Sequence, residues 1–265
     1  MDKIFVSQLA LFVAFVKLKN FATGLMLIKA DESMNIMAEL KKIITNDGSI
    51  TFHNFEFDET YHSITGAEEE ALKKFSEPCK IKEMALQKEI FILDVCFGLG
   101  YNSAVAIEEI LKINSECKIK IFALENDLEI LKKITEIDSS LESFVFLKQI
   151  PELINNSKEN VDLIHLENNN IDLTIFVDDA LVSIKKVPKK SIDLVFQDPF
   201  SPKKCPELWT KDFFYDIKKT MKKSGVLATY SCAGQVRRNL KEANFIVKDG
   251  PCVGRRSPGT LAYLE

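Results

Sequence analysis

The sequence predicts an α/β fold in which a seven-stranded, mostly parallel sheet carries helices on both faces, with a small N-terminal appendage. From residue 90 onward, short apolar segments alternate with segments of helical spacing. This pattern is typical of parallel strands whose two faces are both covered. The last two apolar segments are joined by a loop instead of a helix, so we expect one of them to be antiparallel.

Seven apolar segments account for the predicted strands. They lie at residues 90–96, 118–126, 172–179, 191–198, 225–231, 245–250 and 259–264. Helical segments lie between them, at residues 101–112, 127–137, 206–222 and 234–243 and in a short stretch from residue 180. Residues 138–170 are less regular. Seven strands with a loop-connected ending favour the methyltransferase variant of the doubly wound sheet over the dinucleotide-binding variant.

Three parts are expected along the chain. Residues 1–33 begin with an apolar run too short to span a bilayer, and we interpret them as a packed helix or as the result of a start codon assigned too early. Residues 34–89 form the appendage, with an alternating strand at 50–57 and a helix at 65–75 that has Thr65 as its N-cap. Residues 90–265 form the sheet domain.

Composition and charge limit the classes of function. The hydrophobic fraction of 46% and the charged fraction of 28% are ordinary for a soluble protein. The net charge of -4 is unevenly spread, because residues 185–265 carry 17 Lys/Arg and 8 Asp/Glu, or +9, and the remainder carries -13. The C-terminal part is therefore suited to a polyanion, with solvated helix faces as the alternative.

The six cysteines form no C-x-x-C pair and no His cluster accompanies them, so we expect no metal site. Free thiols beside apolar runs indicate a reducing, cytoplasmic compartment.

Polar side chains follow the predicted strands at their carboxyl ends, where an open α/β sheet binds its ligands. The first strand ends in Asp94 and a loop with Gly98 and Gly100, whose lack of side chains allows a close approach to a ligand. Glu125 ends the next strand, placed to accept both hydroxyls of a ribose. These features leave a nicotinamide dinucleotide or S-adenosylmethionine as the cofactor. Asp179, placed to bond an adenine amino group, and the absence of a third glycine favour the second, which has no phosphate.

The fourth strand ends in the tract Q-D-P-F-S-P, residues 197–202. Methyl transfer to nitrogen needs a free, aligned amine lone pair. Asp198 is suited to accept an amine N–H, orient the lone pair, stabilise the developing charge and pass on the released proton. Phe200 is suited to pack against the target or the cofactor. A proline-bordered turn with a capping Asp is the alternative.

The run E-T-Y-H-S, residues 59–63, places Tyr61 and His62 ahead of the sheet domain, either as a lid over the cofactor or as an exposed hairpin strand. Four stretches of the chain, D-G-S-I-T-F…D-E-T-Y-H-S-I-T-G-A-E-E-E, L-D-V-C-F-G-L-G-Y-N-S, V-F-Q-D-P-F-S-P-K-K-C-P-E-L-W-T and V-G-R-R-S-P-G-T, together resemble the MnmC-type tRNA 5-methylaminomethyl-2-thiouridine methyltransferases. The resemblance extends from about residue 45 to the C-terminus.

The resemblance implies a Rossmann-like methyltransferase that uses S-adenosyl-L-methionine to methylate the 5-aminomethyl group of (2-thio)uridine at the tRNA wobble position. Asp198 and Phe200 would be catalytic. The residues implied to bind the cofactor are Tyr61, His62, Asp94, Phe97, Gly98, Gly100, Tyr101, Asn102, Glu125, Asn126, Asp179 and Ala180. The residues expected to bind the tRNA anticodon stem-loop are Lys203, Lys204, Arg237, Arg238, Arg255 and Arg256.

The chain departs from the family pattern at Cys205, where Asn is common, and at Asp178, where Gly is common. The bifunctional members also carry a flavin-dependent oxidase domain, and the sequence suggests the stand-alone form without it. No obligate protein partner is expected. The alternatives are a methyltransferase of another amine, a non-catalytic RNA-binding relic and, more distantly, a nicotinamide-dependent oxidoreductase.

Overall fold

The computed structural model describes residues 40–157, 160–253 and 256–264. Two compact units divide the chain, Met1–Glu39 and Leu40–Glu265, and all described residues belong to the second. The expectations for residues 1–33 and for Arg255 lie outside the described residues. Within the described part, no helix is long and apolar enough to cross a membrane.

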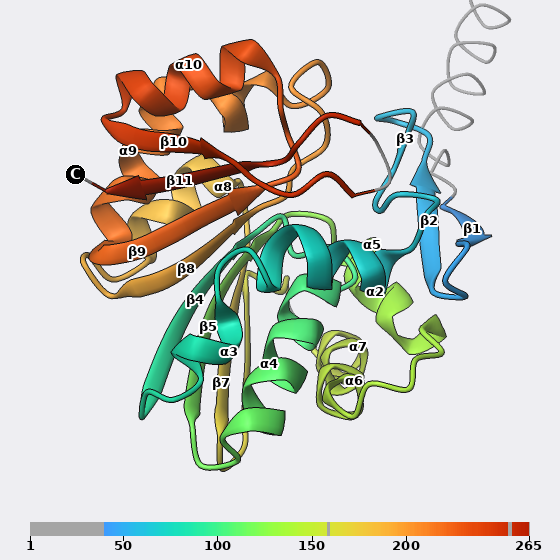
Figure 1. Cartoon of the computed structure of the whole chain (residues 1–265). Helices are drawn as coiled ribbons and strands as arrows, with labels where there is room; N and C mark the ends of the chain where they lie inside the picture. The colour runs from blue at the N-terminus through green and yellow to red at the C-terminus, as the bar shows by residue number, and fades with distance from the viewer. Residues whose placement is uncertain (1–39, 158–159, 254–255, 265) are drawn as a thin grey trace, which may run out of the picture. The chain divides into compact units, whose positions relative to one another are not determined.

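The main sheet of this second unit has the strand order β10-β11-β9-β8-β4-β5-β7-β6 (Figure 1). Its strands are β4 (Glu89–Val95), β5 (Lys118–Glu125), β6 (Leu163–Glu167), β7 (Ile171–Val177), β8 (Ile192–Gln197), β9 (Met221–Thr229), β10 (Phe245–Asp249) and β11 (Thr260–Leu264). The five strands β9, β8, β4, β5 and β7 are parallel neighbours. β11 runs antiparallel to both β9 and β10, which confirms the expected antiparallel strand at the end of the chain.

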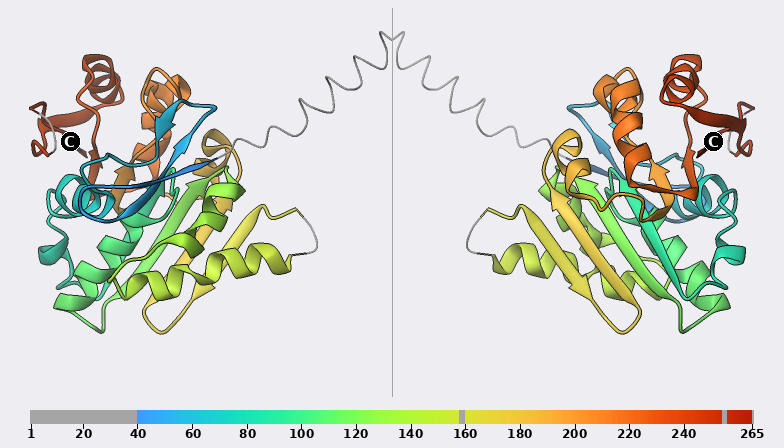
Figure 2. Two further views of the ribbon diagram at one scale, coloured as in Figure 1. Left: turned by 90° about the vertical axis from the view of Figure 1, so that its right-hand side faces the viewer. Right: turned by 90° about the vertical axis from the view of Figure 1, so that its left-hand side faces the viewer.

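The sheet has eight strands, one more than predicted. The extra strand, β6, pairs antiparallel with β7 at the sheet edge, where Figure 2 shows the two side by side. It lies in the stretch that the sequence left irregular. Only two of its five residues are buried, because an edge strand covered on one face needs few apolar positions, and this weakens its signal.

Helices cover both faces of the sheet (Figures 1 and 2), as predicted. Alternate residues along each strand enter different cores, so that Ile92 of β4 lies in one and Leu93 in the other. The first core is shared with η1 (Ala71–Ser76), α3 (Ile81–Met84), α4 (Tyr101–Ile113), α5 (Leu128–Lys132), η2 (Lys133–Glu136), α6 (Ser143–Leu147) and α7 (Gln149–Asn156). The second is shared with α8 (Ala180–Ser183), η3 (Ile184–Lys186), η4 (Pro206–Trp209), α9 (Lys211–Thr220) and α10 (Gly234–Glu242).

The helix predicted at residues 206–222 is divided in the structure. Its first turn is the 3-10 helix η4, and α9 begins after Thr210, whose hydroxyl accepts the N–H of Phe213 at 3.2 Å. Met221 already belongs to β9. Thr210 acts as an N-cap inside the predicted segment, a start signal that the apolar periodicity concealed.

A three-stranded antiparallel sheet precedes this core, formed by β1 (Lys41–Ile44), β2 (Ile50–Asn54) and β3 (Glu59–Thr60). The following helix, α2 (Ala67–Glu70), starts after Gly66, so the predicted N-cap Thr65 is wrong. Side chains from the turn between β1 and β2 accept hydrogen bonds from the free N–H groups at the start of α2. Ser49 Oγ accepts the N–H of Ala67 at 2.8 Å, and Asp47 Oδ2 accepts that of Glu69 at 3.1 Å. This long-range cap has no local sequence signature.

Candidate active site

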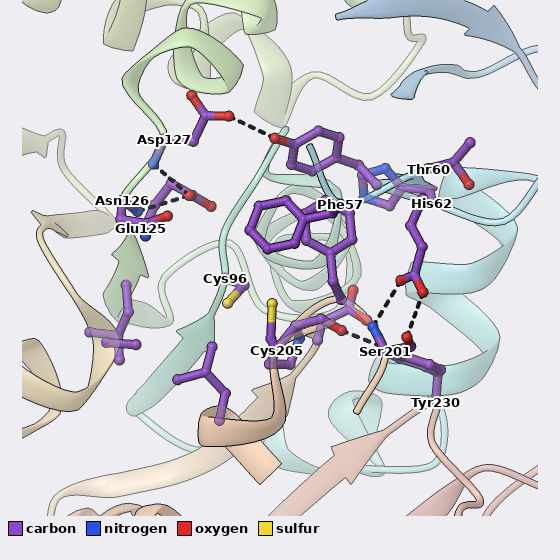
Figure 3. A pocket seen from close by; sticks show the side chains of 18 of the residues that line it. Phe57, Thr60, His62, Cys96, Glu125, Asn126, Asp127, Ser201, Cys205 and Tyr230 are labelled. Atoms are coloured by element: carbon purple, nitrogen blue, oxygen red, sulfur yellow. Dashed lines mark hydrogen bonds between the residues drawn. The ribbon is translucent and has the colours of Figure 1, made fainter. Parts of the chain in front are cut away.

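A pocket of about 760 Å³ opens at the carboxyl ends of β4, β5, β7 and β8 (Figure 3). It is lined by strand-end residues of the sheet and by the hairpin of β2 and β3. An open parallel sheet places its ligand site at this edge, because the loops that follow the strands meet there. Eight of the predicted site residues line it: Tyr61, His62, Glu125, Asn126, Asp179, Ala180, Asp198 and Phe200.

The loop after β4 turns through left-handed backbone conformations at Cys96 (φ 63°), Gly98 (φ 55°) and Gly100 (φ 79°). A Cβ at Gly100 would lie 2.7 Å from the Phe97 ring, so glycine is required there for space as well as for φ. Phe97 and Tyr101 are buried beneath the loop and do not line the pocket. The Tyr101 hydroxyl instead donates to the carbonyl of Ile50 at 2.9 Å, which ties α4 to β2.

Asp94 also lies below the pocket and not on its wall. It is fully buried and accepts the hydroxyl of Ser103 at 2.6 Å. Burial raises the pKa of Asp94 to about 7.

Glu125 ends β5 with its carboxylate on the pocket wall. One oxygen accepts the N–H of Gly98 at 2.8 Å, and the other accepts those of Asn126 and Asp127 at 2.8 and 2.9 Å. Burial raises the pKa of Glu125 to about 7, and these three backbone donors act in the opposite direction. The carboxylate is therefore oriented by the same glycine loop that turns beneath the pocket.

The end of β7 places Asp178 and Asp179 at the pocket. Asp179 is the N-cap of α8, since its side chain accepts the N–H of Leu181 at 2.8 Å. Asp178 pairs with Lys186 at 3.3 Å. The acid that departs from the family pattern is thus held by a lysine beside the pocket.

Asp198 follows β8 and is partly buried in the pocket wall. Its N–H donates to the carbonyl of Val95 at 3.2 Å, and its Oδ2 accepts the side-chain N–H of Asn102 at 2.8 Å. Asn102 does not line the pocket itself, but its hydrogen bond orients the Asp198 side chain, which does. Burial, followed by the charge of Glu70, raises the pKa of Asp198 well above its usual range. Such a shift at a pocket wall is typical of a functional carboxylate.

The β2–β3 hairpin contacts both sides of the pocket. Phe57 stacks on Phe200 with ring centroids 4.7 Å apart, and Ser201 donates its N–H to Glu59 at 2.9 Å. On the other side, the Tyr61 hydroxyl donates to Asp127 at 2.7 Å (Figure 3). The segment 59–63 therefore covers the pocket in this structure and is not an exposed hairpin strand.

His62 is buried within this hairpin, and its Nδ1 lies 3.2 Å from the hydroxyl of Thr51. Burial lowers the pKa of His62 to about 4, so the ring is neutral at neutral pH.

Comparisons with known proteins identify the family to which the chain belongs. A family of S-adenosyl-L-methionine-dependent methyltransferases matches residues 141–265. The crystal structure of MnmC2 from Aquifex aeolicus is 34% identical, with a TM-score of 0.72 over 87% of this chain and 72% of that one. The chain belongs to the MnmC-type methyltransferase family. This result confirms the predicted family and the Rossmann-like methyltransferase fold.

Longer relatives show the same similarity. An uncharacterized protein of Methanocaldococcus jannaschii is 32% identical over 88% of this chain. The tRNA 5-methylaminomethyl-2-thiouridine biosynthesis bifunctional protein MnmC of Leptospira borgpetersenii is 26% identical over 76% of it. The chain spans 63% of the first protein and 31% of the second.

The cofactor of this MnmC-type methyltransferase is S-adenosyl-L-methionine. The pocket fits it, because the Glu125 carboxylate faces the cavity as a hydrogen-bond acceptor for a ribose and Asp179 lies at the adjacent strand end.

The basic residues expected to bind tRNA differ in their surroundings. Lys203 and Lys204 are exposed and lie between two pocket-lining residues, Ser201 and Cys205. Arg256 is also exposed, close in sequence to the pocket-lining Val253.

Two arginines of α10 are engaged within the chain. Arg237 donates to Asp249 at 2.5 Å, to Thr260 at 3.0 Å and to the carbonyl of Gly259 at 2.9 Å. Its guanidinium thus links the end of β10 to the start of β11. Arg238 donates to Gln235 at 2.8 Å.

Several pocket residues escaped the sequence interpretation. The clearest are Glu70 and Lys74, a buried ion pair on the pocket wall. In the sequence they belong to a charged helical run and have the spacing of an exposed pair. Only the neighbouring apolar Phe75 signals that this side of the helix turns inward. Phe57 and Asp127 are further examples.

Proposed function

We propose that the protein transfers a methyl group from S-adenosyl-L-methionine to the 5-aminomethyl nitrogen of (2-thio)uridine at the tRNA wobble position, giving 5-methylaminomethyl-(2-thio)uridine. The observation that carries this proposal is Asp198, a partly buried carboxylate on the wall of the pocket that Glu125 also lines. Similarity to MnmC2 and to the bifunctional MnmC proteins supports the choice of substrate.

In this proposal, Glu125 accepts the ribose hydroxyls and Asp179 the adenine amino group, while Tyr61 and His62 close the pocket from the hairpin. Bound S-adenosyl-L-methionine supplies an electrophilic methyl group on a sulfonium. Asp198 accepts an N–H of the substrate amine, which orients the nitrogen lone pair toward the methyl group and stabilises the charge that develops on nitrogen. Its raised pKa suits it to take up the proton that the amine releases.

Phe200 and Phe57 provide a surface for the uracil ring. Their stacked rings lie beside Asp198, and Tyr61 lies against Phe200 with centroids 5.0 Å apart. A nucleobase displaced from an RNA loop is commonly bound by aromatic stacking. The ring of the substrate would then present its aminomethyl group to the carboxylate.

The proposed partner is the anticodon stem-loop of tRNA, and the basic residues proposed to contact it are Lys203, Lys204, Arg238, Arg255 and Arg256. No obligate protein partner is proposed. A cytoplasmic location follows from this substrate.

Substitution of Asp198 tests the proposal. With tRNA bearing aminomethyl groups and labelled cofactor, we expect Asp198→Asn to reduce kcat by about 100-fold or more, the usual effect of removing a positioned acid–base group. Its affinity for S-adenosyl-L-homocysteine should stay within about threefold, because Asp198 faces the amine. Nucleoside mass spectrometry of the product identifies the methylated position. Wild-type protein that binds cofactor but transfers no label to this tRNA would contradict the proposal.

A second candidate is methylation of another amine. Among the described residues, nine Asp or Glu and one Lys line the pocket. This excess of negative charge favours a cationic amine, whether the amine belongs to an RNA or to a small molecule. Dependence on tRNA separates the two functions, since a small amine accepted at a similar kcat/KM would favour the second.

A further inference from the structure

The pocket wall holds an ion pair that the proposed mechanism does not use. Glu70 and Lys74 are 8% and 7% exposed, and both line the pocket with Asp198. Glu70 is fixed from the other side, because its second carboxylate oxygen accepts the N–H of Ser63 at 2.9 Å. The free energy lost when two opposite charges are removed from water offsets most of their attraction. A buried ion pair therefore contributes little to stability, and stability alone does not explain its presence here.

The neighbouring pair on the same helical segment provides a comparison. Glu69 and Lys73 have the same spacing, and their side chains are 37% and 48% exposed. One residue further along the chain, the second Glu–Lys pair, Glu70 and Lys74, lines the pocket instead of facing solvent. The turn occurs where α2 passes into the π-helical segment η1, a type of irregularity common at functional sites.

We infer that Lys74 is a positioning residue that offsets the negative charge of Glu70 in the pocket of Asp198 and so favours the ionised form of Asp198, which can accept the N–H and then the proton of the substrate amine. Without a cation, two carboxylates buried in one site favour a state in which they share a proton. With Lys74 present, the charge of Glu70 is offset, and ionisation of Asp198 leaves the three groups with a net charge of only -1. The inference rests on the proposed function for the identity of the amine but not for the charge state of Asp198.

The surroundings of Asp198 support this assignment. Glu70 and Asp94 raise the pKa of Asp198, whereas Lys74 and the hydrogen bond from Asn102 lower it. Other titratable groups that line the same pocket include Cys96 from the loop after β4, Glu125 from β5, and His62, which follows β3. Lys74 is the one lysine or arginine among the described residues that line the pocket, so its removal leaves the carboxylates without a cation.

The test uses two cofactor analogues, so that it needs no substrate. Sinefungin carries an amino group where the reactive methyl would lie, and S-adenosyl-L-homocysteine carries none. An ionised Asp198 should favour sinefungin, so the ratio of the S-adenosyl-L-homocysteine dissociation constant to that of sinefungin should rise as pH increases through the pKa of Asp198. Isothermal titration calorimetry from pH 5 to 9 gives the midpoint of this rise. Asp198→Asn should abolish the rise, which assigns it to Asp198.

We expect Lys74→Met to move this midpoint upward by about one pH unit or more, and Lys74→Arg to leave it near the wild-type value. Glu70→Gln should move it downward, because it removes a negative neighbour. Lys73→Met, in the exposed pair, is the matched control and should have no effect. In the tRNA assay, Lys74→Met should lower kcat about fivefold or more at the wild-type midpoint, and kcat should recover toward alkaline pH.

An unchanged or lowered midpoint in folded Lys74→Met would overturn the inference. If that variant does not fold, as judged by circular dichroism, the direction of the Glu70→Gln shift decides. An upward shift or none would count against the inference. Failure of the tRNA assay in the wild-type protein would contradict the proposed function and leave the analogue measurement intact.

Discussion

At the scale of single residues, the site consists of buried acids whose charge is controlled by a few fixed donors. Glu125 is held by three backbone N–H groups and Asp198 by the side chain of Asn102. Burial raises the pKa of both carboxyl groups. Glycines at 98 and 100 allow the loop to turn beneath these acids, and the lack of a side chain is required most strictly at Gly100.

The Gly100 requirement can be measured by comparison with Gly48, which also has a positive φ (85°) but no atom within 4 Å of an added Cβ. Gly48→Ala should lower the free energy of unfolding by about 1–2 kcal/mol through backbone strain. Gly100→Ala adds a clash with the Phe97 ring, which is 3% exposed and cannot move away freely, so it should cost about 1–3 kcal/mol more. Urea unfolding followed by circular dichroism gives both values. Equal losses of stability would show that the clash with Phe97 is not limiting.

At the scale of elements, the N-terminal appendage shapes the site through the hairpin of β2 and β3 and through the helix that follows. The hairpin joins the end of β5, through Tyr61 and Asp127, to the loop after β8, through Glu59 and Ser201. The helix supplies Glu70 and Lys74, and its start is held by the turn between β1 and β2. Asp47 in this turn accepts hydrogen bonds from Thr45, Ser49 and Glu69.

Asp47→Ala should lower the free energy of unfolding by about 1–2 kcal/mol at pH 7, the usual cost of removing a helix cap. Burial acts to raise the pKa of Asp47, but its hydrogen bonds prevail and lower it below 3.8. The stabilisation is therefore complete above pH 3.8 and is lost as pH falls through the lower value in the folded protein. Urea midpoints at pH 7 and pH 3 test this dependence. Asp138→Ala, at an exposed acid, is the control, and an equal loss of stability there would contradict the capping role.

At the scale of the whole molecule, charge is divided along the chain. The C-terminal 81 residues carry +9 although the protein as a whole is acidic, and the pocket itself is lined mainly by carboxylates. A polyanion would therefore contact basic residues outside the pocket, while a cationic group enters it. Lys203 and Lys204 directly follow residues 197–202, the tract that contains Asp198, and are exposed.

Affinity for tRNA should fall as salt concentration rises, because binding to phosphates releases counterions. The double change Lys203→Ala and Lys204→Ala should reduce the slope of log affinity against log salt by about 0.7–0.9 for each phosphate that these lysines neutralise. The matched control is Lys189→Ala with Lys190→Ala, because these exposed lysines precede β8 at the opposite edge of the sheet. Filter binding at several salt concentrations measures the slopes, and equal slopes for both double variants would remove these residues from the proposed interface.

Much of the fold could be predicted because the signals are local. Buried parallel strands are continuous apolar runs, and all seven predicted strands are present. The weaker strand β6 was missed because its pattern is short and half exposed. The helix cap was assigned to Thr65 because a local rule applied there, whereas the side chains that meet the first turn of the helix come from residues 47 and 49.

The acids of the site were also predictable, since Glu125, Asp179 and Asp198 end their strands and parallel strands bring their carboxyl ends to one edge. The sequence by itself determined this set, the family and the cofactor class, because each depends on residue type and spacing along short segments. Only the tertiary structure decided that Glu70 and Lys74 line the same pocket as Asp198 and that Arg237 holds the last strands. The direction in which a charged side chain points depends on packing between distant segments. Charged helical segments therefore have similar sequences whether their side chains contact solvent, a neighbouring strand or the active site.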